Sequence, residues 1–288
     1  MENKYGFVPD ALITKDNYVM GASELPRVVI QPDGNWSDFT PEEEIQQRYG
    51  IETYNCTAFG STSLIEMVLY KMGYIRNYSD RALGIMAGTY PPGNSPHKVM
   101  ETIRGKGLVL ENMVPFAPDL ENFDQYYDKN VITEDVKTES KRWLTLVDFG
   151  HEWVFTPEHD PTEQRERIKE ALTYSPLGVS VYAWQKEGDV YVKPVGSGDN
   201  HWCTLINIED DGRYKIFDSY DNTIKYLHPS FTFGWCKRIH LDLKVSDMDY
   251  YDEDHMVPQN AMIDPIHKLF LWLKDIIFIS FNAIKKIL

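Results

Sequence analysis

The stretch Tyr54-Asn55-Cys56-Thr57-Ala58-Phe59-Gly60-Ser61 lies between a polar, turn-like segment and an apolar run, and it decides the fold that the sequence predicts. The run from Leu64 to Met72 has helical spacing, which indicates a helix with one buried face. Cys56 then lies in the first turn of that helix, where unpaired N–H groups and the helix dipole stabilise a thiolate. Free cysteines are also among the most buried residues, so an inert buried thiol is the alternative interpretation.

The composition is that of an ordinary globular protein. The 288 residues are 42% apolar and 25% charged, which suffices for one large domain or two small ones. The formal net charge of −15 argues against general binding to nucleic acid or to anionic lipid over the whole surface. Partners are therefore expected among proteins, except where a local segment differs.

The cysteines and the first residues indicate a reducing compartment. Cys56, Cys203 and Cys236 are too few for a disulfide framework, and no two have metal-ligand spacing. We therefore expect no metal and no cofactor. Residues 1–5 lack the apolar core of a secretory signal, so we expect cytoplasmic synthesis.

Helix patterns come first along the chain and strand patterns later, which predicts an α+β architecture with two lobes. Ser79 and Ser95 are expected to cap two short helices after the Cys56 helix, and Pro41 to begin another before it. A further helix is expected over residues 162–173. The predicted strands are residues 28–30, 143–147, 178–184, 202–208, 214–217 and 223–227.

The pattern divides the chain into four parts. Residues 1–40 read as an N-terminal extension, 41–245 as the main domain, 246–264 as an acidic linker and 265–288 as a C-terminal apolar helix. Polar residues interrupt the last segment and gather toward one side, which favours an amphipathic helix. It is expected to pack on its own domain or a partner chain, to bind a membrane surface, or to span the bilayer; the sequence leaves these alternatives open.

Two polar residues at strand ends complete a candidate catalytic set with Cys56. A nucleophilic cysteine needs a base and a group that orients the base. His201 lies where a polar turn enters an apolar strand, and Asp218 ends the next strand of the same hairpin. Strand ends that neighbour in a hairpin bring two side chains to one rim. Taken singly, His201 reads as a surface or satisfied histidine and Asp218 as a turn residue; their order and setting favour the triad.

Several segments between Pro41 and Arg238 resemble the papain-like cysteine peptidases. Cys56-Thr57-Ala58-Phe59 is similar to the Cys-Trp-Ala-Phe at the start of that family's central helix. Residues 78–81 resemble the family's Leu-Ser-Glu-Gln, and residues 93–116 resemble its glycine-rich loop through Tyr-Pro-Tyr. Residues 176–181 resemble its Gly-Pro-Val-Ser-Val. Residues 200–201 resemble its Asn-His pair, and residues 218–220 its Asn-Ser-Trp.

The resemblance implies a papain-like fold, with a helical lobe that carries Cys56 and a β-rich lobe that carries His201. It assigns Cys56 as nucleophile, His201 as base and Asp218, in place of the family's asparagine, as the orienting group. It further implies hydrolysis of protein or peptide substrates through a thioester acyl-enzyme. The family's oxyanion glutamine is best matched by Gln46, with Gln47 or Asn55 as substitutes.

Departures from the family pattern leave other functions open. The sequence before Pro41 is short for an inhibitory pro-segment, and disulfide cysteines are absent, as in family members of bacteriophage or bacterial origin. One alternative is a non-catalytic structural or binding protein with the same fold, anchored by the C-terminal helix to a membrane or a virion. The other is a cysteine amidase that acts on cell walls.

Overall fold

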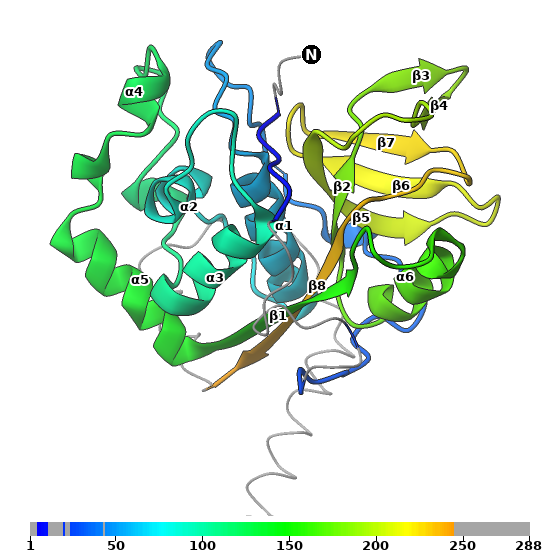
Figure 1. Cartoon of the computed structure of the whole chain (residues 1–288). Coiled ribbons are helices and arrows are strands. Elements are labelled where there is room, and N and C mark those ends of the chain that lie inside the picture. The colour runs from blue at the N-terminus through cyan, green and yellow to red at the C-terminus, as the bar shows by residue number, and fades with distance from the viewer. Residues whose placement is uncertain (1–4, 11–19, 21–23, 43, 245–288) are drawn as a thin grey trace, which may run out of the picture. The chain divides into compact units, whose positions relative to one another are not determined.

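The computed structural model describes residues 5–10, 20, 24–42 and 44–244 (Figure 1). The predicted linker 246–264 and the predicted C-terminal helix 265–288 lie outside the described residues. In the part that is described, a group of helices and a twisted antiparallel sheet flank one central helix, α1. Among the described helices, none is long and apolar enough to cross a lipid bilayer.

The central helix α1 (Cys56–Lys71) begins and ends where the sequence predicts, at Cys56 and just before Gly73. It is buried on every side from Cys56 to Leu69, not on one face as predicted, because helices pack on one side of it and strand β5 (His201–Ile208) on the other. Its hydroxyl groups bond to carbonyls one turn back, such as Ser61 to Thr57, so polar residues are tolerated in the core.

Four further helices form the helical half of the fold. Ser79 and Ser95 cap α2 and α3 as predicted, each accepting a backbone N–H three residues on. The helices of this half are α2 (Asp80–Ala87), α3 (Pro96–Lys106), α4 (Phe123–Tyr126) and α5 (Glu134–Leu146).

The prediction of a strand over residues 143–147 is wrong for all but its last residue, because residues 143–146 complete α5. Thr133 caps this helix, and its buried residues Val136, Ser140 and Trp143 recur at helical spacing. The indole Nε1 of Trp143 donates to the Tyr78 hydroxyl at 3.0 Å. The apolar run that suggested a strand crosses the junction between α5 and β1, which begins at Val147.

Two other local predictions also fail. Residues 28–30 form no strand, and Val28 and Val29 are each 55% exposed. No helix follows Pro41 in the described residues of that segment. Long-range backbone bonds hold both segments instead: Ile30 donates its N–H to the Thr173 carbonyl at 2.9 Å, and Gln46 donates its N–H to the Ser219 carbonyl at 2.7 Å.

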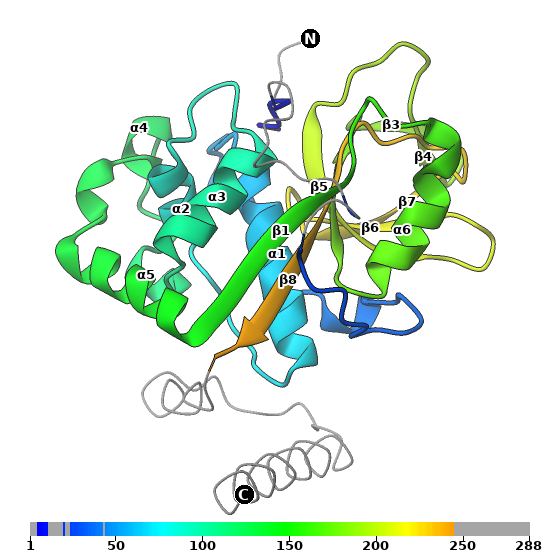
Figure 2. The same cartoon turned by 60° about the horizontal axis from the view of Figure 1, so that its bottom comes forward.

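The sheet has eight strands in the order β1-β8-β2-β5-β6-β7-β4-β3. All neighbours pair antiparallel except β4 and β7. The other strands are β1 (Val147–Phe155), β2 (Leu177–Val181), β3 (Gln185–Glu187), β4 (Val190–Val192), β6 (Tyr214–Asp218), β7 (Thr223–Leu227) and β8 (Cys236–Leu243). Helix α6 (Gln164–Leu172) packs on β1, β2 and β5, while β1 and β8 form a long ribbon beside α1 (Figure 2).

Three carboxyl groups are buried together beside α1. Glu44, Glu66 and Asp80 are 1%, 3% and 6% exposed. Glu66 accepts the backbone N–H of Tyr78 at 2.7 Å, and Asp80 accepts the hydroxyl of Thr62. Burial, together with the neighbouring carboxyl groups, raises the pKa of Glu44 and Glu66, and burial raises the pKa of Asp80 to about 7. The protonated form of these acids is therefore the one that the fold favours.

We expect Asp80→Asn to stabilise the protein at pH 8. The pKa of Asp80 in the folded state, about 7, lies above the unfolded value of about 3.9. Its contribution to stability is therefore complete below the unfolded pKa and is lost as the pH rises through about 7. Asparagine does not ionise, so the free energy of unfolding should rise by about 2 kcal/mol at pH 8 and change little at pH 4. Urea denaturation at both pH values measures this.

The matched control is Asp135→Asn, an exposed residue in the first turn of α5. It should change the free energy of unfolding by no more than about 0.5 kcal/mol at either pH. If Asp80→Asn lowers the free energy of unfolding equally at both pH values, the buried charge of Asp80 is not what lowers the stability of the protein at pH 8.

Candidate active site

A buried histidine–aspartate pair lies where β5 and β6 adjoin. His201 is the first residue of β5 and Asp218 the last of β6, as predicted, and the two strands pair antiparallel. The Nε2 atom of His201 lies 2.7 Å from Oδ1 of Asp218, and both side chains are fully buried. The hairpin therefore brings the predicted base and its orienting group together.

Four further groups bond to the carboxylate of Asp218, one of them the Cys203 thiol, which donates to Oδ1 at 3.7 Å. The Nζ atom of Lys225 lies 2.7 Å away, the Trp184 indole donates at 3.0 Å, and the backbone N–H of Tyr220 donates at 3.0 Å. Burial acts to raise the pKa of Asp218, but His201 and Lys225 outweigh it and hold this pKa well below its usual range. The carboxylate is therefore ionised and fixed in orientation.

Lys225 and Trp184 were not predicted as site residues. Lys225 is 5% exposed and lies on β7 between two residues that face outward more, so a lysine at an inward-facing strand position was the available signal. Trp184 follows the end of β2, and no sequence pattern connects it with Asp218. Both residues matter because they saturate the second carboxylate oxygen.

Cys56 begins α1 and faces β5. Its side chain is fully buried and packs with Phe7, Trp153 and Trp202, the residue that follows His201. The backbone N–H groups of Trp202 and Thr57 donate to its sulfur. The Nδ1 atom of His201, which faces away from Asp218, is buried and has no hydrogen-bond partner among the described residues. That nitrogen is available to take a proton.

The thiol of Cys56 is neutral in this state, contrary to the expectation of a stabilised thiolate. Burial raises the pKa of Cys56 well above its ordinary value, and the charges of Asp218 and Glu52 add to the shift. The two backbone N–H groups act in the opposite direction but are outweighed. The burial that raises this pKa comes from the side chains that cover the sulfur atom.

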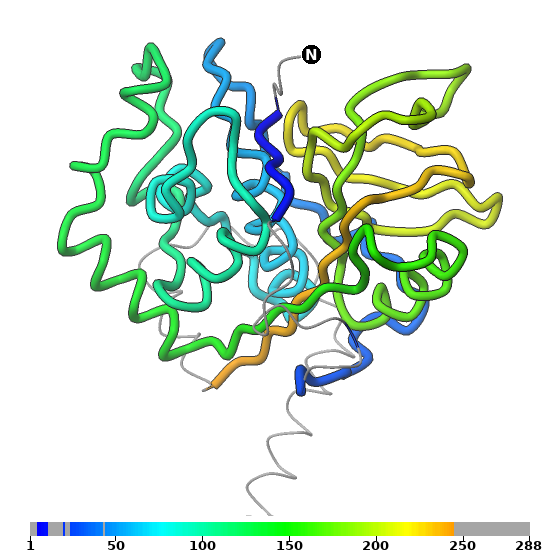
Figure 3. Tube along the Cα trace, viewed as in Figure 1, coloured from blue at the N-terminus to red at the C-terminus, as the bar shows by residue number. Residues whose placement is uncertain are grey.

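The cover is formed by residues 5–8, which run between the two halves of the fold (Figure 3). The Tyr5 ring lies 4.8 Å from the His201 ring and 4.8 Å from the Tyr220 ring, measured between centroids. Phe7 is 1% exposed, and its ring stacks on Trp202 at 6.0 Å with 9° between the planes. These side chains close the site over Cys56 and His201.

Backbone bonds hold the same segment in place, with Gly6 at a φ of 99°. Val8 donates its N–H to the Asn94 carbonyl, and Asn94 donates its N–H to the Gly6 carbonyl, each at 2.9 Å. The side-chain amide of Gln46 donates to the Tyr5 carbonyl at 3.1 Å. The main chain of residues 5–8, which the sequence had assigned only to an N-terminal extension, is thus bonded to Gln46 and Asn94.

Among the three oxyanion candidates, only Gln46 presents its amide to a peptide carbonyl at this site. Its side chain is buried, and its backbone N–H is fixed by the Ser219 carbonyl at 2.7 Å. The amide of Asn55 instead donates to the Asp80 carbonyl and to a tyrosine hydroxyl. Gln47 is exposed. The geometry therefore favours Gln46 over its two substitutes.

The indole of Trp202 is confined by two glycines. A Cβ atom on Gly60 of α1 would lie 2.8 Å from the ring, and one on Gly178 of β2 would lie 2.4 Å from it. With Phe7 stacked on its face, the ring is enclosed by α1, β2 and residues 5–8. Glycine at both positions is what lets the bulky indole lie beside Cys56.

Among the described residues, two groups of side chains have the composition of metal ligands. His201, Cys203 and Asp218 form one group, and the cationic Lys225 already occupies its carboxylate. His97, Glu101 and His151 form the other. In the second group His151 pairs with Glu101 at 2.8 Å and receives the Lys237 ammonium at 3.1 Å on its other nitrogen. Burial and the neighbouring Lys237 lower the pKa of His151 to about 3.

Two solved structures of similar fold belong to proteins described as a cysteine protease and a procathepsin. The chain is similar to xylellain, a cysteine protease from Xylella fastidiosa, with a TM-score of 0.57 and 13% identity over 85% of this chain and 97% of that one. The fold is papain-like. Digestive procathepsin L 3 of Tenebrio molitor is also similar to this papain-like chain, with a TM-score of 0.56 and 12% identity over 83% of this chain and 77% of that one. No protein-family model and no curated protein matches the sequence.

We expect Gly6→Ala to open the site of this papain-like protein. Gly6 has a φ of 99°, and a Cβ atom there would lie 2.0 Å from the Tyr54 carbonyl oxygen, so the segment cannot stay in place. The rate of alkylation of Cys56 by iodoacetamide at pH 7.5, followed by peptide mass spectrometry, should rise at least about tenfold as burial of the thiol is lost.

Gly105→Ala is the matched control, because a Cβ atom there meets nothing within 4 Å. Its alkylation rate should equal that of the unaltered protein. If Gly6→Ala leaves the rate unchanged while the fold is retained, residues 5–8 do not limit access to Cys56.

We expect Lys225→Met to destabilise the protein by about 3 kcal/mol at pH 7, since it leaves the buried Asp218 carboxylate with one cation fewer. Urea denaturation measures the loss. Lys186→Met, an exposed lysine on β3, is the control and should change stability by no more than about 0.5 kcal/mol. Similar small effects of both substitutions would mean that the ion pair with Lys225 contributes nothing net.

Proposed function

We propose that this protein is a cysteine peptidase that hydrolyses peptide bonds with Cys56, His201 and Asp218. One observation carries the proposal: Gln46 and Asn94 bond to the main chain of residues 5–8, whose side chains Phe7 and Tyr5 pack on Cys56 and on His201. A site that binds a stretch of main chain beside a thiol and a buried histidine–aspartate pair has the parts that peptide hydrolysis needs. The similarity to solved cysteine proteases supports the fold on which this assignment rests.

Each residue has a step in the proposed reaction. When residues 5–8 leave, water reaches the thiol, and Cys56 transfers its proton to the Nδ1 atom of His201. The thiolate attacks the peptide carbonyl, and the oxyanion is bound by the Gln46 amide and the backbone N–H of Cys56. Imidazolium then protonates the leaving amine. Water, deprotonated by His201, hydrolyses the thioester and restores the thiol.

Asp218 acts through His201 in this scheme. Its bond to Nε2 keeps Nδ1 directed away from the carboxylate and stabilises the imidazolium form that the proton transfer creates. Lys225 and Trp184 occupy the other carboxylate oxygen, so Asp218 cannot rotate away. The orienting group is therefore set before substrate binds.

A non-catalytic protein with this fold is the second candidate. The observation that favours it is the closed state itself, in which Cys56 is fully buried and its pKa is raised by that burial. A scaffold would keep this state permanently, whereas a peptidase must leave it.

The test compares the two candidates in the Gly6→Ala protein. If the protein is a peptidase, the rate of Cys56 alkylation should rise with pH and reach a plateau below pH 8. In His201→Ala this plateau should be absent. The opened protein should cleave members of a peptide library, and Cys56→Ala should abolish cleavage. Gln46→Ala should lower kcat by about 10²–10³, while Gln47→Ala, the matched control, leaves it unchanged.

An alkylation rate that rises through about 8.5 and ignores His201 would instead describe an unactivated thiol. Together with no cleavage of peptides, this result would establish the scaffold. If the protein releases fragments from peptidoglycan but cleaves no member of the peptide library, the result would identify a cell-wall amidase.

A further inference from the structure

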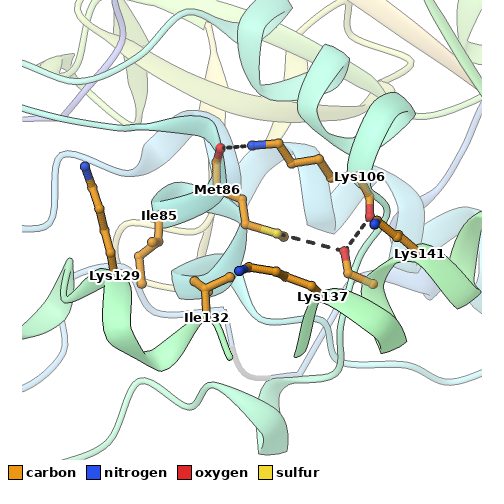
Figure 4. A pocket seen from close by; sticks show the side chains of 8 residues that line it. Ile85, Met86, Lys106, Lys129, Ile132, Lys137 and Lys141 are labelled. Carbon is orange, nitrogen blue, oxygen red and sulfur yellow. Dashed lines mark hydrogen bonds between the residues drawn. The ribbon is translucent and has the colours of Figure 1, made fainter. Parts of the chain in front are cut away.

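A cavity lies in the helical half, and none of its lining residues belongs to the proposed site. Its volume is about 480 Å³. Residues from the end of α2, the end of α3, the short 3-10 helix η3 (Lys129–Val131) with the residue after it, and α5 line it (Figure 4). They are Ile85, Met86, Lys106, Lys129, Ile132, Lys137, Ser140 and Lys141. The volume is in the range of cavities that hold a single small molecule.

The apolar part of the cavity is aliphatic and continuous with the core. Ile85 is 7% exposed, and Met86 and Ile132 pack against the buried cluster that holds these helices together. None of the eight lining residues is aromatic. A flat ring or nucleobase would find no stacking partner there, whereas a flexible alkyl chain fits against methionine and isoleucine.

Four lysines surround this apolar surface, and none of the eight lining residues is acidic. Lys106 donates to the Met86 carbonyl at 2.7 Å, and Lys137 pairs with the exposed Glu134 at 2.7 Å. In the described part of the chain, Lys129 and Lys141 form no ion pair within 4.0 Å. All four side chains are exposed. Lys129 and Lys141 lie at opposite ends of the cavity, so an anionic group at either end meets a lysine that forms no ion pair within 4.0 Å among the described residues (Figure 4).

The positive charge here is opposite in sign to the protein as a whole. The chain has 44 acidic and 29 basic residues, so a cavity with four lysines and no acid is a local exception. Such a field concentrates anions at this place and not over the rest of the surface. Lysine ammonium groups are point charges on flexible stems, which suits a small anionic head group without fixed geometry.

We propose that this cavity binds a single-chain amphiphile with a carboxylate head group, of the fatty-acid class. The alkyl chain lies on Ile85, Met86 and Ile132, and the carboxylate lies among the lysine ammonium groups, where Lys129 and Lys141 are not engaged in ion pairs. A concave cavity takes one molecule, and the net charge of −15 opposes adsorption of the surface to an anionic bilayer. Binding is independent of the chemistry at Cys56.

Titration calorimetry of the full chain with dodecanoate, below its micellar concentration, tests the proposal. Dodecanoate should bind with one molecule per chain and at least about tenfold tighter than dodecyltrimethylammonium, which has the same alkyl chain and the opposite charge. Acetate, which lacks the chain, should not bind. Raising the salt concentration should weaken the binding of dodecanoate, because the lysines are exposed.

The double variant Lys129→Gln/Lys141→Gln should bind dodecanoate about tenfold more weakly, as expected for the loss of two exposed charge contacts. Lys169→Gln/Lys186→Gln is the matched control: it removes the same charge from exposed positions on α6 and β3 and should bind as the unaltered protein does. Thermal unfolding curves of both variants establish that they are folded.

Several results would overturn the proposal. Equal weakening by both double variants would reduce the effect to net charge. Equal binding of the cationic and anionic amphiphiles, or binding of many molecules per chain, would describe non-specific adsorption. Sedimentation with phosphatidylserine vesicles without binding of dodecanoate would assign the surface to membranes.

Discussion

The buried carboxylate of Asp218 is the interaction on which the site depends. A lone carboxylate in the interior would take up a proton, since burial alone raises its pKa. Here it receives His201, Lys225, Trp184 and a backbone N–H, drawn from four separate segments of the β-rich half. Because each donor needs the carboxylate, the charge also fixes β5, β6 and β7 relative to one another. The residues that orient the base thus also hold the sheet together.

The parts of the site that could be predicted from sequence are those with a local signal. Cys56 stands at a helix start, and His201 and Asp218 stand at the ends of strands that the alternation of apolar residues makes visible. Lys225 could not be found in this way, because a lysine in a short strand reads as solvated until its inward position is known. Burial of Glu66 within α1 was likewise hidden, since its neighbours in the sequence indicated only one buried face.

The covering segment could not be predicted, for a different reason. Phe7 pairs with Asn94, and Tyr5 meets Gln46, across long separations in the chain that no local pattern reports. The wrong prediction at residues 143–147 also comes from information that the local sequence does not contain. There the apolar residues were identified correctly, but their period was judged across a helix–strand junction, and only the packing of Trp143 on Tyr78 distinguishes the two.

The segment that covers the Cys56 thiol belongs to the same chain and competes with every other ligand of the site. The covering segment is tethered, so its effective concentration is high, and a peptide in solution binds only to the fraction of molecules in which the segment has left. The apparent affinity for any ligand of the site is reduced by that fraction. Access to Cys56 therefore depends on the few contacts that Tyr5, Gly6 and Phe7 make.

The enclosure of Trp202 constrains how relatives of this protein can differ. Gly60, Gly178 and Phe7 lie on three sides of one indole, so their sizes are not independent variables. A relative with a side chain at either glycine position must have a smaller residue in place of the tryptophan, and the covering aromatic then loses the surface on which it stacks. Over evolutionary time these positions should covary as a group, and the size of the residue after the histidine should report whether a chain keeps its own cover.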